Sequence, residues 1–306
     1  MIFSTELKNE LSRRDIVDKT LATSELCAFI RTNGTISFNN FSFNIRFETT
    51  NNAIMRRIFK LFKFVYGYEG NIIISKISNL RKNNVYKMYV KDEQISKKFL
   101  IDVKFSNTDS LFLQDDLYNI ENISKEFIKN FLCGLFLGAG SISNPDKNYH
   151  LEFSLNSKEF SNLVIKYLKI FDMKSKSIEK KGQYIVYIKD SQTISNFLSL
   201  IETVNTLFKF EEIRVIKEIK NNTNRLTNCE TANLDKTLNT SFSQIDAIKL
   251  VYKKIGKENL DKSLLELCEL RLKNPSYSLQ TLANILKISK SGVNHRFKKI
   301  IDLSKK

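Results

Sequence analysis

The first two thirds of the chain repeat themselves at a fixed offset of 106 residues. The string CAFIRTNG, which starts at Cys27, corresponds to CGLFLGAG, which starts at Cys133, and the same offset places Gly34 on Gly140. The strings at 43–51 and 149–157 match at this offset as well. Chance similarity between two apolar helices would not extend through the segments that follow them. The repeat therefore restricts the fold to two copies of one unit.

Within each copy, the spacing of apolar residues predicts the elements. Phe43, Ile45 and Phe47 alternate with polar residues, as in a half-buried strand, and Ile54, Ile58 and Phe62 follow at helical spacing. Two further strands are expected in each copy, at 71–77 and 85–90 and at 177–181 and 184–188, with a closing helix at 95–103 and 191–201. Each copy therefore predicts helix–β–β–α–β–β–α, an α+β unit.

This element order, with an apolar helix that ends in Gly in each copy, resembles the LAGLIDADG homing-endonuclease fold. The second copy carries LCGLFLGAG at 132–140, and the first carries the more degenerate LCAFIRTNG at 26–34. The resemblance implies two pseudosymmetric repeats whose motif helices pack side by side. Small residues allow such helices to approach closely. Those available here are Cys27, Ala28, Cys133, Gly134 and Gly138.

The residues before the final Gly of each motif depart from the nuclease pattern. In the nucleases, an acidic residue at this position holds the divalent metals, and here the positions are Asn33 and Ala139. Two-metal hydrolysis needs carboxylates to fix the cations. The sequence therefore predicts a protein that is not an enzyme, with no catalytic residue, no metal and no cofactor. An active nuclease would need the two missing acids.

The chain is basic, and the charge is concentrated near its end. Lys and Arg outnumber Asp and Glu by 49 to 33, and the last 20 residues hold seven basic residues against Asp302. A second basic run lies at 214–225. Basic clusters favour nucleic acid as a partner, although a charge run is also an ordinary solvated surface.

The C-terminal third predicts helices alone. Amphipathic helices are expected at 245–255 and 260–273, with Asn274-Pro275 ending the second. Ser278 and Ser289 are expected N-caps of two short helices separated by a turn at Lys287-Ile288. A small residue in the first of these helices and a basic second helix are typical of a helix-turn-helix. The expected inward residues are Leu279, Leu282, Ala283, Leu286, Val293, Phe297, Ile300 and Ile301.

In a helix-turn-helix, the second helix enters the major groove of double-stranded DNA. We expect Ser291, Asn294, His295 and Arg296 to face base edges, since Asn suits adenine and Arg suits guanine. His295 could equally be an ordinary surface residue, and Gly292 is either a weak point of the helix or a site of close approach to DNA. The phosphate-contacting candidates are Lys290, Lys298, Lys299 and Arg225.

Two short sequence strings make the resemblance more specific, because both are similar to one family. NCETANL at 228–234, followed by Lys236-Thr237, and SKSGVNHR at 289–296 resemble the WhiA family, and the likeness covers essentially the whole chain. It implies a bacterial DNA-binding regulator of transcription or chromosome organisation, linked to sporulation, cell division or chromosome segregation. The segment around NCETANL is either an inter-domain linker or a surface on which Asn224, Arg225 and Lys236 reach phosphates. Glu230 is expected to begin a helix or to form an ion pair, not to catalyse.

The expected domains are a first repeat at 1–106, a second at 107–220, a linker at 221–240 and a helix-turn-helix domain at 241–306. The repeats would offer DNA a basic β-saddle, with Arg46, Arg56, Arg57 and Lys60 as weaker candidates. Alternatively, the repeats form a protein-interaction platform, with DNA contacted only by the C-terminal domain.

The expected compartment is the cytoplasm, with the protein on the nucleoid, because no apolar run is long enough to cross a membrane. Four scattered cysteines without a CxxC pair indicate neither disulfides nor zinc, and three of them are expected to be buried. Besides DNA, a second regulatory protein is a candidate partner, and no small-molecule substrate is expected. His150 is expected on a strand face.

Overall fold

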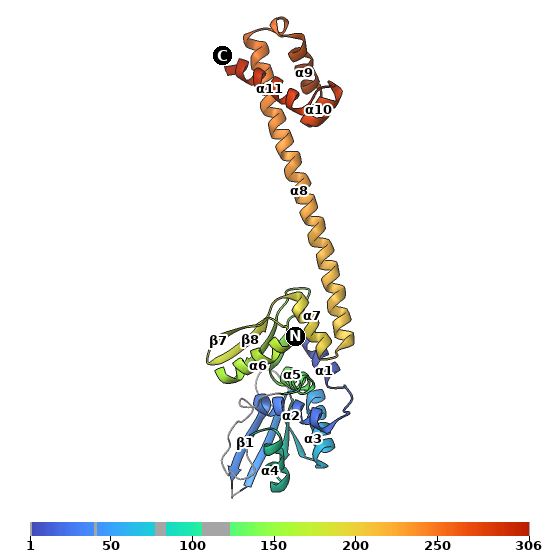
Figure 1. The fold of residues 1–306 in the computed structure, drawn as a ribbon, viewed down its shortest axis with the longest axis vertical. Helices are drawn as coiled ribbons and strands as arrows, with labels where there is room; N and C mark the ends of the chain where they lie inside the picture. The colour runs from blue at the N-terminus through green and yellow to red at the C-terminus, as the bar shows by residue number, and fades with distance from the viewer. Residues whose placement is uncertain (1, 40–41, 77–83, 106–122, 306) are drawn as a thin grey trace. The chain divides into compact units, whose positions relative to one another are not determined.

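The computed structural model describes residues 2–39, 42–76, 84–105 and 123–305 (Figure 1). The chain divides into two units, 1–216 and 217–306, each of which is considered by itself. Unit 1 contains two antiparallel sheets with their helices, and unit 2 contains helices alone in its described part. The expected class, two LAGLIDADG-like α+β repeats followed by a helical helix-turn-helix region, is confirmed.

The elements of unit 1 follow the predicted order in both copies. The first copy contains α2 (Lys19–Asn33), β1 (Gly34–Asn39), β2 (Ser42–Thr49), α3 (Asn52–Tyr66), β3 (Asn71–Lys76), β4 (Asn84–Val90) and α4 (Glu93–Asp102). The second contains α5 (Lys125–Ala139), β5 (Gly140–Ile142), β6 (Leu151–Leu155), α6 (Lys158–Ile170), β7 (Lys176–Lys180), β8 (Gln183–Ile188) and α7 (Ser191–Leu200). A helix that was not predicted, α1 (Ile2–Leu11), precedes them.

The two sheets have the same topology and register. Their strand orders are β1-β2-β4-β3 and β5-β6-β8-β7. Gly34 pairs with Phe47 in the first sheet and Gly140 with Phe153 in the second, so both partners keep the offset of 106 residues. The helix that follows is capped in the same way, by Asn51 in the first copy and by Ser157 in the second. The repeat in the sequence is therefore a repeat of hydrogen-bonding positions.

The α2 and α5 helices pack against each other at the centre of unit 1 (Figure 1). The expected small residues make this approach possible. A Cβ atom added at Gly134 would collide with the carbonyl oxygen of Glu25, and one added at Gly138 would collide with the Thr32 hydroxyl. Cys27, Ala28 and Cys133 are buried in the same region. Glycine at 134 therefore sets how closely the two copies can approach.

Buried aromatic rings fill the space between each motif helix and its sheet. Phe47 contacts Phe29, Phe62 and Phe99, with centroid separations of 5.8 to 6.1 Å. In the second copy, Phe153 contacts Phe136 and Phe197 at 6.3 and 5.7 Å. The matched strand residues 47 and 153 therefore anchor corresponding clusters, and aromatic pairs of this kind stabilise a core beyond their buried area.

The helix that follows α7 is longer than predicted. One helix, α8 (Val204–Lys254), contains both the segment expected as a linker and the helix expected at 245–255. Thr223, Thr237 and Thr240 donate hydrogen bonds to the carbonyl oxygens four residues earlier. No Gly or Pro occurs between 204 and 254, so nothing in the sequence forces the helix to end. The Asn- and Thr-rich composition, which suggested irregular chain, is a weak signal by comparison.

Unit 2 packs the end of α8 against α9 (Lys262–Lys273), α10 (Leu279–Ile285) and α11 (Lys290–Lys305). The turn before α9 contains Gly256, whose φ of 87° favours glycine, and a short 3-10 helix at Lys257–Asn259. The buried core of this unit consists of Ala247, Ile248, Val251, Leu264, Leu267, Cys268, Leu282, Ala283, Val293, Phe297 and Ile300.

The structure also bears on what the sequence predicted for the four cysteines and for membrane-spanning segments. Cys27, Cys133 and Cys268 are buried and Cys229 is exposed, and all four are free thiols. Burial raises the pKa of Cys133 to about 12. Among the helices of the described residues, none has a stretch that is both long enough and apolar enough to span a bilayer.

The contact at Gly134 generates a stability prediction. We expect Gly134→Ala to lower the free energy of unfolding by about 1–3 kcal/mol, because the new methyl group meets a backbone carbonyl that cannot move independently. This cost must exceed the gain of about 1 kcal/mol in helix propensity. Denaturant unfolding of the full chain would measure it.

Gly138→Ala is the matched control for this prediction. It lies in the same helix, but its new methyl group meets side-chain atoms of Thr32 and Asn33, which can shift. We expect a smaller loss than at Gly134. Equal stability of the Gly134→Ala protein and the unmodified protein would contradict the packing account.

Candidate nucleic-acid interface

The helix-turn-helix is built from α10, a four-residue turn and α11. The Ser278 hydroxyl accepts a hydrogen bond from the Thr281 amide at 3.1 Å, which caps α10 as predicted. The Ser289 hydroxyl accepts one from the Gly292 amide at 3.0 Å at the start of α11. Between them Lys287 has a φ of 52°, and the Ile288 amide donates to the Ala283 carbonyl oxygen at 3.1 Å. The two helices are therefore held at a fixed turn.

The faces of α11 divide as the sequence predicted. Val293, Phe297 and Ile300 are buried against Leu282 and Ala283 of α10, while Leu279, Leu286 and Ile301 pack at the edge of this core. Ser291, His295 and Lys298 lie on the opposite face, at the spacing i, i+4 and i+7, and are exposed. Asn294 and Lys290 are exposed as well. Five of the seven predicted contact residues in α11 therefore share its exposed side.

The other two predicted residues of α11 are engaged within unit 2. The Arg296 guanidinium donates a hydrogen bond to the Ser263 carbonyl oxygen at 3.2 Å, and its side chain is half-buried. The Lys299 ammonium forms an ion pair with Asp261 at 3.1 Å. Both bonds join α11 to the start of α9. To reach DNA, these two side chains would have to release their present partners.

The structure decides only in part between the two interpretations of Gly292, a weak point of the helix or a site of close approach to DNA. A Cβ atom added there would lie 3.3 Å from the Ser289 hydroxyl and 3.8 Å from the Ile288 side chain. The helix does not break at this residue, which lies in the first turn of α11. A side chain at this position would therefore require a small shift of the capping Ser289 hydroxyl.

The segment around NCETANL is helical and exposed. Residues 221–236 of α8 are exposed on every side, including Asn224, Arg225, Cys229 and Lys236. A helix that is polar all round gains little from packing. Because Glu230 lies in the middle of α8, it does not begin a helix, and that part of the expectation was wrong.

The motif helices of unit 1 end at a pocket whose chemistry differs from a metal site. Asn33, Gly138 and Gly140 line it together with Lys8 and Glu48. The Asn33 side-chain amide donates to the Glu48 carbonyl oxygen at 3.2 Å, and burial lowers the pKa of Lys8 to about 8. The Glu48 carboxylate lies 3.7 Å from both Arg46 and Lys87. Within the described residues, no cluster of three or more His, Cys, Asp or Glu side chains is arranged to hold a metal ion.

The open faces of the two sheets are less basic than expected. On β2, Phe43, Ile45 and Phe47 are buried beneath the helices, so residues such as Arg46 and Glu48 occupy the other face. In the second sheet, His150 precedes β6, bonds to Glu152 at 2.8 Å and stacks on Tyr187. Among the described strand residues, those that are charged and lie on the two open faces by register are Arg46, Glu48, Lys87, Glu152, Lys176 and Lys180. Two carboxylates among four cations do not make a strongly basic saddle.

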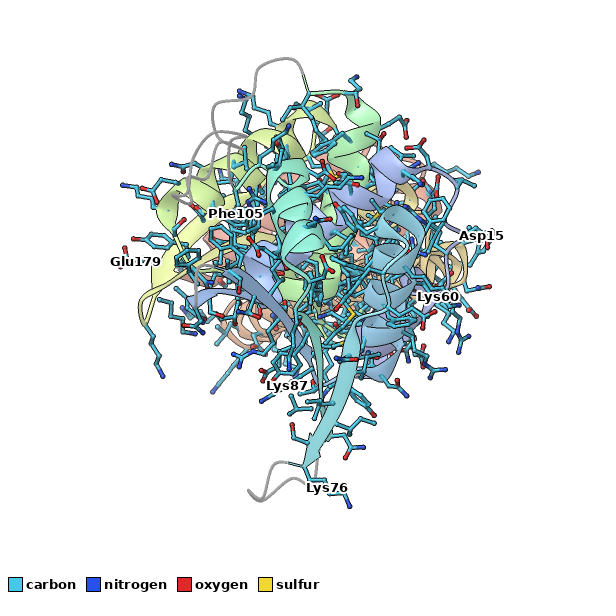
Figure 2. The ribbon with its side chains drawn as sticks, turned by 90° about the horizontal axis from the view of Figure 1, so that it is seen from below. Asp15, Lys60, Lys76, Lys87, Phe105 and Glu179 are labelled. Carbon is cyan, nitrogen blue, oxygen red and sulfur yellow. The ribbon has the colours of Figure 1, made fainter. Side chains whose placement is uncertain are left out.

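Three of the four arginine and lysine candidates for the saddle lie elsewhere. Arg56 and Lys60 are on the exposed side of α3, the helix that covers the opposite face of the sheet through Phe62 and Phe47. Figure 2 shows Lys60 on α3 and Lys87 on the sheet at separate places. Only Arg46 lies on the open face. The sequence placed the four together because it could not distinguish a helix over the back of a sheet from one at its rim.

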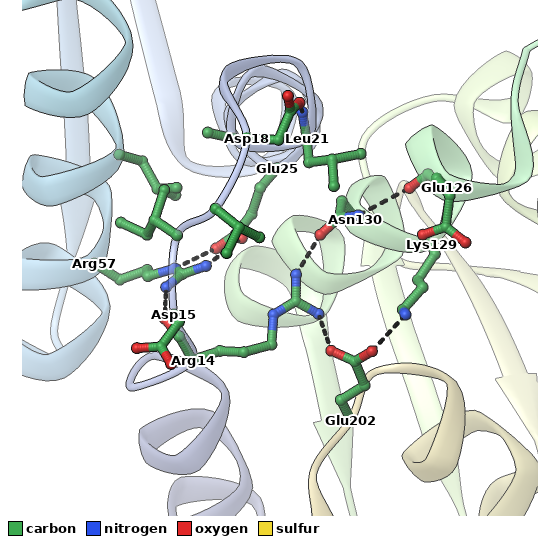
Figure 3. A pocket seen from close by; sticks show the side chains of 14 residues that line it. Arg14, Asp15, Asp18, Leu21, Glu25, Arg57, Glu126, Lys129, Asn130 and Glu202 are labelled. Atoms are coloured by element: carbon green, nitrogen blue, oxygen red, sulfur yellow. Dashed lines mark hydrogen bonds and ion pairs between the residues drawn. The ribbon is translucent and has the colours of Figure 1, made fainter.

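Arg57 is a clear correction, because its side chain is buried. Its guanidinium forms two hydrogen bonds with Glu25, at 3.0 and 2.9 Å, and a third with the Arg14 carbonyl oxygen (Figure 3). Arg57 and Glu25 are 3% and 2% exposed. In the same pocket Arg14 bonds to Asn130, and both Arg14 and Lys129 contact Glu202 (Figure 3). This network joins the two copies and leaves Arg57 unable to reach DNA.

The burial of Arg57 generates a second stability prediction. We expect Arg57→Met to lower the free energy of unfolding by about 3–5 kcal/mol, because it leaves the Glu25 carboxylate buried without its partner. Arg56→Met, at the exposed neighbouring position, should change it by less than about 0.5 kcal/mol. Urea unfolding of both proteins gives the comparison, and equal effects at 56 and 57 would overturn the burial of Arg57.

The sequence did not lead us to expect two buried charged residues, although the position of each in its helix could have indicated burial. Glu25 lies in the apolar part of α2, and Arg271 continues the inward stripe of Leu264, Leu267 and Cys268 on α9. A charge that falls on the apolar side of a predicted helix must find a partner or a role inside the fold. Arg271 is 1% exposed and bonds to the Tyr277 carbonyl oxygen at 2.5 Å.

Comparison with protein-family models divides the chain into three matches. Residues 19–106 match the WhiA N-terminal LAGLIDADG-like domain, 128–220 the WhiA LAGLIDADG-like domain, and 223–304 the WhiA C-terminal HTH domain. Among curated relatives, the "Probable cell division protein WhiA" of Clostridium botulinum strain Hall is 39% identical over 98% of this chain and 96% of the relative. The protein of the same name from Clostridium tetani is 38% identical over the same shares.

Among solved structures, the chain is similar to those of WhiA proteins. The crystal structure of full-length DUF199/WhiA from Thermatoga maritima is 28% identical, with a TM-score of 0.60 over 98% of this chain and 97% of that one. The N-terminal LAGLIDADG domain of DUF199/WhiA is also 28% identical, with a TM-score of 0.52 over 67% of this chain and 96% of that domain.

Proposed function

The chain belongs to the WhiA family, and from that premise we propose that it is a non-enzymatic DNA-binding regulator that acts in bacterial cell division. The observation that carries this proposal is the exposed face of α11. A capped helix-turn-helix presents Ser291, Asn294 and His295 away from its core, where a second helix reads the major groove. The relatives' printed name supplies the link to cell division.

The contacts divide by chemistry. Ser291, Asn294 and His295 are proposed to face base edges, and Lys290, Lys298 and Arg225 to contact phosphates. Arg296 and Lys299 join these two groups only if their bonds to the start of α9 open on binding. The proposed role covers transcription or chromosome organisation on the nucleoid in the cytoplasm, with sporulation or chromosome segregation as the wider process and a second regulatory protein as a further partner.

The absence of catalysis is part of the same proposal. Asn33 and Ala139 occupy the positions at which the nucleases carry metal-binding acids, and the adjacent pocket contains the ammonium group of Lys8. A cation in this place opposes the binding of divalent metal. Incubation of supercoiled plasmid with the protein and Mg²⁺ is expected to leave the plasmid intact, and nicking by a purified preparation would contradict the proposal.

Base discrimination by Asn294 is the direct test of the interface. We expect Asn294→Ala to lose about 1–3 kcal/mol of discrimination at one base pair, because a bidentate contact to adenine would be removed. Fluorescence anisotropy against a set of single-position variants of a bound site measures this. Asn284→Ala, at an exposed position of α10, is the matched control and should leave discrimination unchanged.

Arg296→Ala separates two roles for that residue. Loss of discrimination at one base pair would place Arg296 on a base. Equal weakening on every sequence, together with lower stability of unit 2, would show that its bond to Ser263 is its function. An unchanged base preference in the Asn294→Ala protein would contradict the base contact proposed for Asn294.

The small net charge of the open sheet faces favours a second possibility for unit 1, a protein-interaction platform. The described strands of its two sheets offer four cations against two carboxylates, so we expect DNA affinity to arise mainly in unit 2. The double variant Arg46→Gln, Lys87→Gln should therefore bind DNA with unchanged affinity in an anisotropy titration. A loss of about tenfold or more, or of one to two phosphate contacts in the salt dependence, would instead place DNA on the first sheet.

A further inference from the structure

Unit 2 contains a pocket that the recognition face of α11 does not account for. Four segments line it: the end of the NCETANL segment on α8, the α9 helix, the start of α10 and the first residue of α11. The lining residues are Lys236, Thr237, Thr240, Arg271, Ser278, Leu279, Gln280 and Lys290. Three of these eight residues are basic and none is acidic, so the pocket has the polarity of an anion site.

Arg271 gives this pocket an unbalanced charge. The side chain is 1% exposed, and desolvation lowers the pKa of its guanidinium. Its hydrogen bonds go to the carbonyl oxygens of Pro275 and Tyr277, its Nε atom has no hydrogen-bond partner, and it lies over the Phe297 ring. Within the described residues, no carboxylate forms an ion pair with it. A buried charge without a counter-charge is costly, and an anion bound in the pocket would offset that cost.

The two lysines place the anion. Lys236 and Lys290 are exposed at the mouth of the pocket, so their ammonium groups are free to close on a ligand. The hydroxyl groups of Thr237 and Thr240 already donate to α8 carbonyl oxygens, so the charged groups supply the attraction. Lys290 is also the first residue of α11, one position before Ser291. An anion held here therefore lies next to the residues proposed to face base edges.

We propose that this pocket binds a single phosphate group of the DNA backbone, held by Lys236 of α8 and Lys290 of α11 above the buried charge of Arg271. The proposal rests on the proposed function and deepens it, because it gives the NCETANL segment a part in DNA binding. Phosphate contacts fix the register of a recognition helix on the duplex. Because Lys236 of α8 and Lys290 of α11 bind the same phosphate, they set the depth at which Ser291 and Asn294 enter the groove.

The test uses the full-length protein and the variants Lys236→Gln and Lys290→Gln. Arg271 also holds the Pro275–Tyr277 loop, so its replacement would unfold unit 2 and is not informative. Lys253→Gln is the matched control, because Lys253 is exposed on α8 outside the pocket. Anisotropy titrations of a duplex at 50 and 200 mM salt give the salt dependence. A parallel thermal melt compares inorganic phosphate with chloride at equal ionic strength.

Loss of one phosphate contact flattens the salt dependence. When salt is raised from 50 to 200 mM, the affinity of the unmodified protein falls by a certain factor. For each pocket variant this factor should be roughly 3.5 times smaller, on specific and non-specific duplexes alike. The double variant should lose less affinity than the product of the two single losses, because both lysines act on the same phosphate. Lys253→Gln should match the unmodified protein.

The remaining outcomes overturn the proposal in distinguishable ways. If the unmodified protein binds DNA and the pocket variants keep its salt slope, the DNA phosphate assignment fails while the proposed function stands. If, in addition, inorganic phosphate stabilises the unmodified protein but not Lys236→Gln, the pocket is a site for a free anion. If the unmodified protein binds no duplex at either salt concentration, the proposed function fails, and the pocket assignment fails with it.

Discussion

The close contact between α2 and α5 is the constraint on which unit 1 depends. Because Gly134 lies against the Glu25 carbonyl, the two motif helices approach without intervening side chains. The first strand of each sheet then begins at Gly34 or at Gly140, in the same register. The same approach buries Glu25, which pairs with Arg57 of its own copy. Arg57 bonds to the Arg14 carbonyl, and the Arg14 side chain continues the network to Asn130 and Glu202 of the second copy. One pair of small-residue helices therefore fixes the positions of both sheets.

The sequence predicted the parts of the fold that depend on periodicity. The 106-residue offset, the strands of both sheets and the two caps of the helix-turn-helix follow from spacing and from residues with strong local preferences, such as Ser278 and Gly34. Features that depend on tertiary partners were beyond it. Arg57 looks like a surface cation until Glu25 is found beneath it, and α8 looks like a linker because Asn and Thr are weak helix formers. Arg296 and Lys299 have the right residue type, but partners on α9 already engage them.

The two units carry different kinds of charge. In unit 1, the buried cations are paired, as in the Arg14, Arg57 and Lys129 network, and the cations of the open sheet faces are partly offset by Glu48 and Glu152. In unit 2, the exposed Lys236 and Lys290 and the buried Arg271 line one pocket at the start of α11. The proposed DNA-contacting residues therefore lie mainly in the helical unit.

The most direct test of this account is a genome-wide crosslinking map of the full-length protein in its own cell, made beside the Asn294→Ala variant. We predict sharp peaks that share a short motif, and a variant that stays bound but tolerates a second base at one motif position. Broad occupancy without a motif, the same in both proteins, would contradict sequence recognition by α11. It would indicate instead a protein that follows the DNA backbone alone.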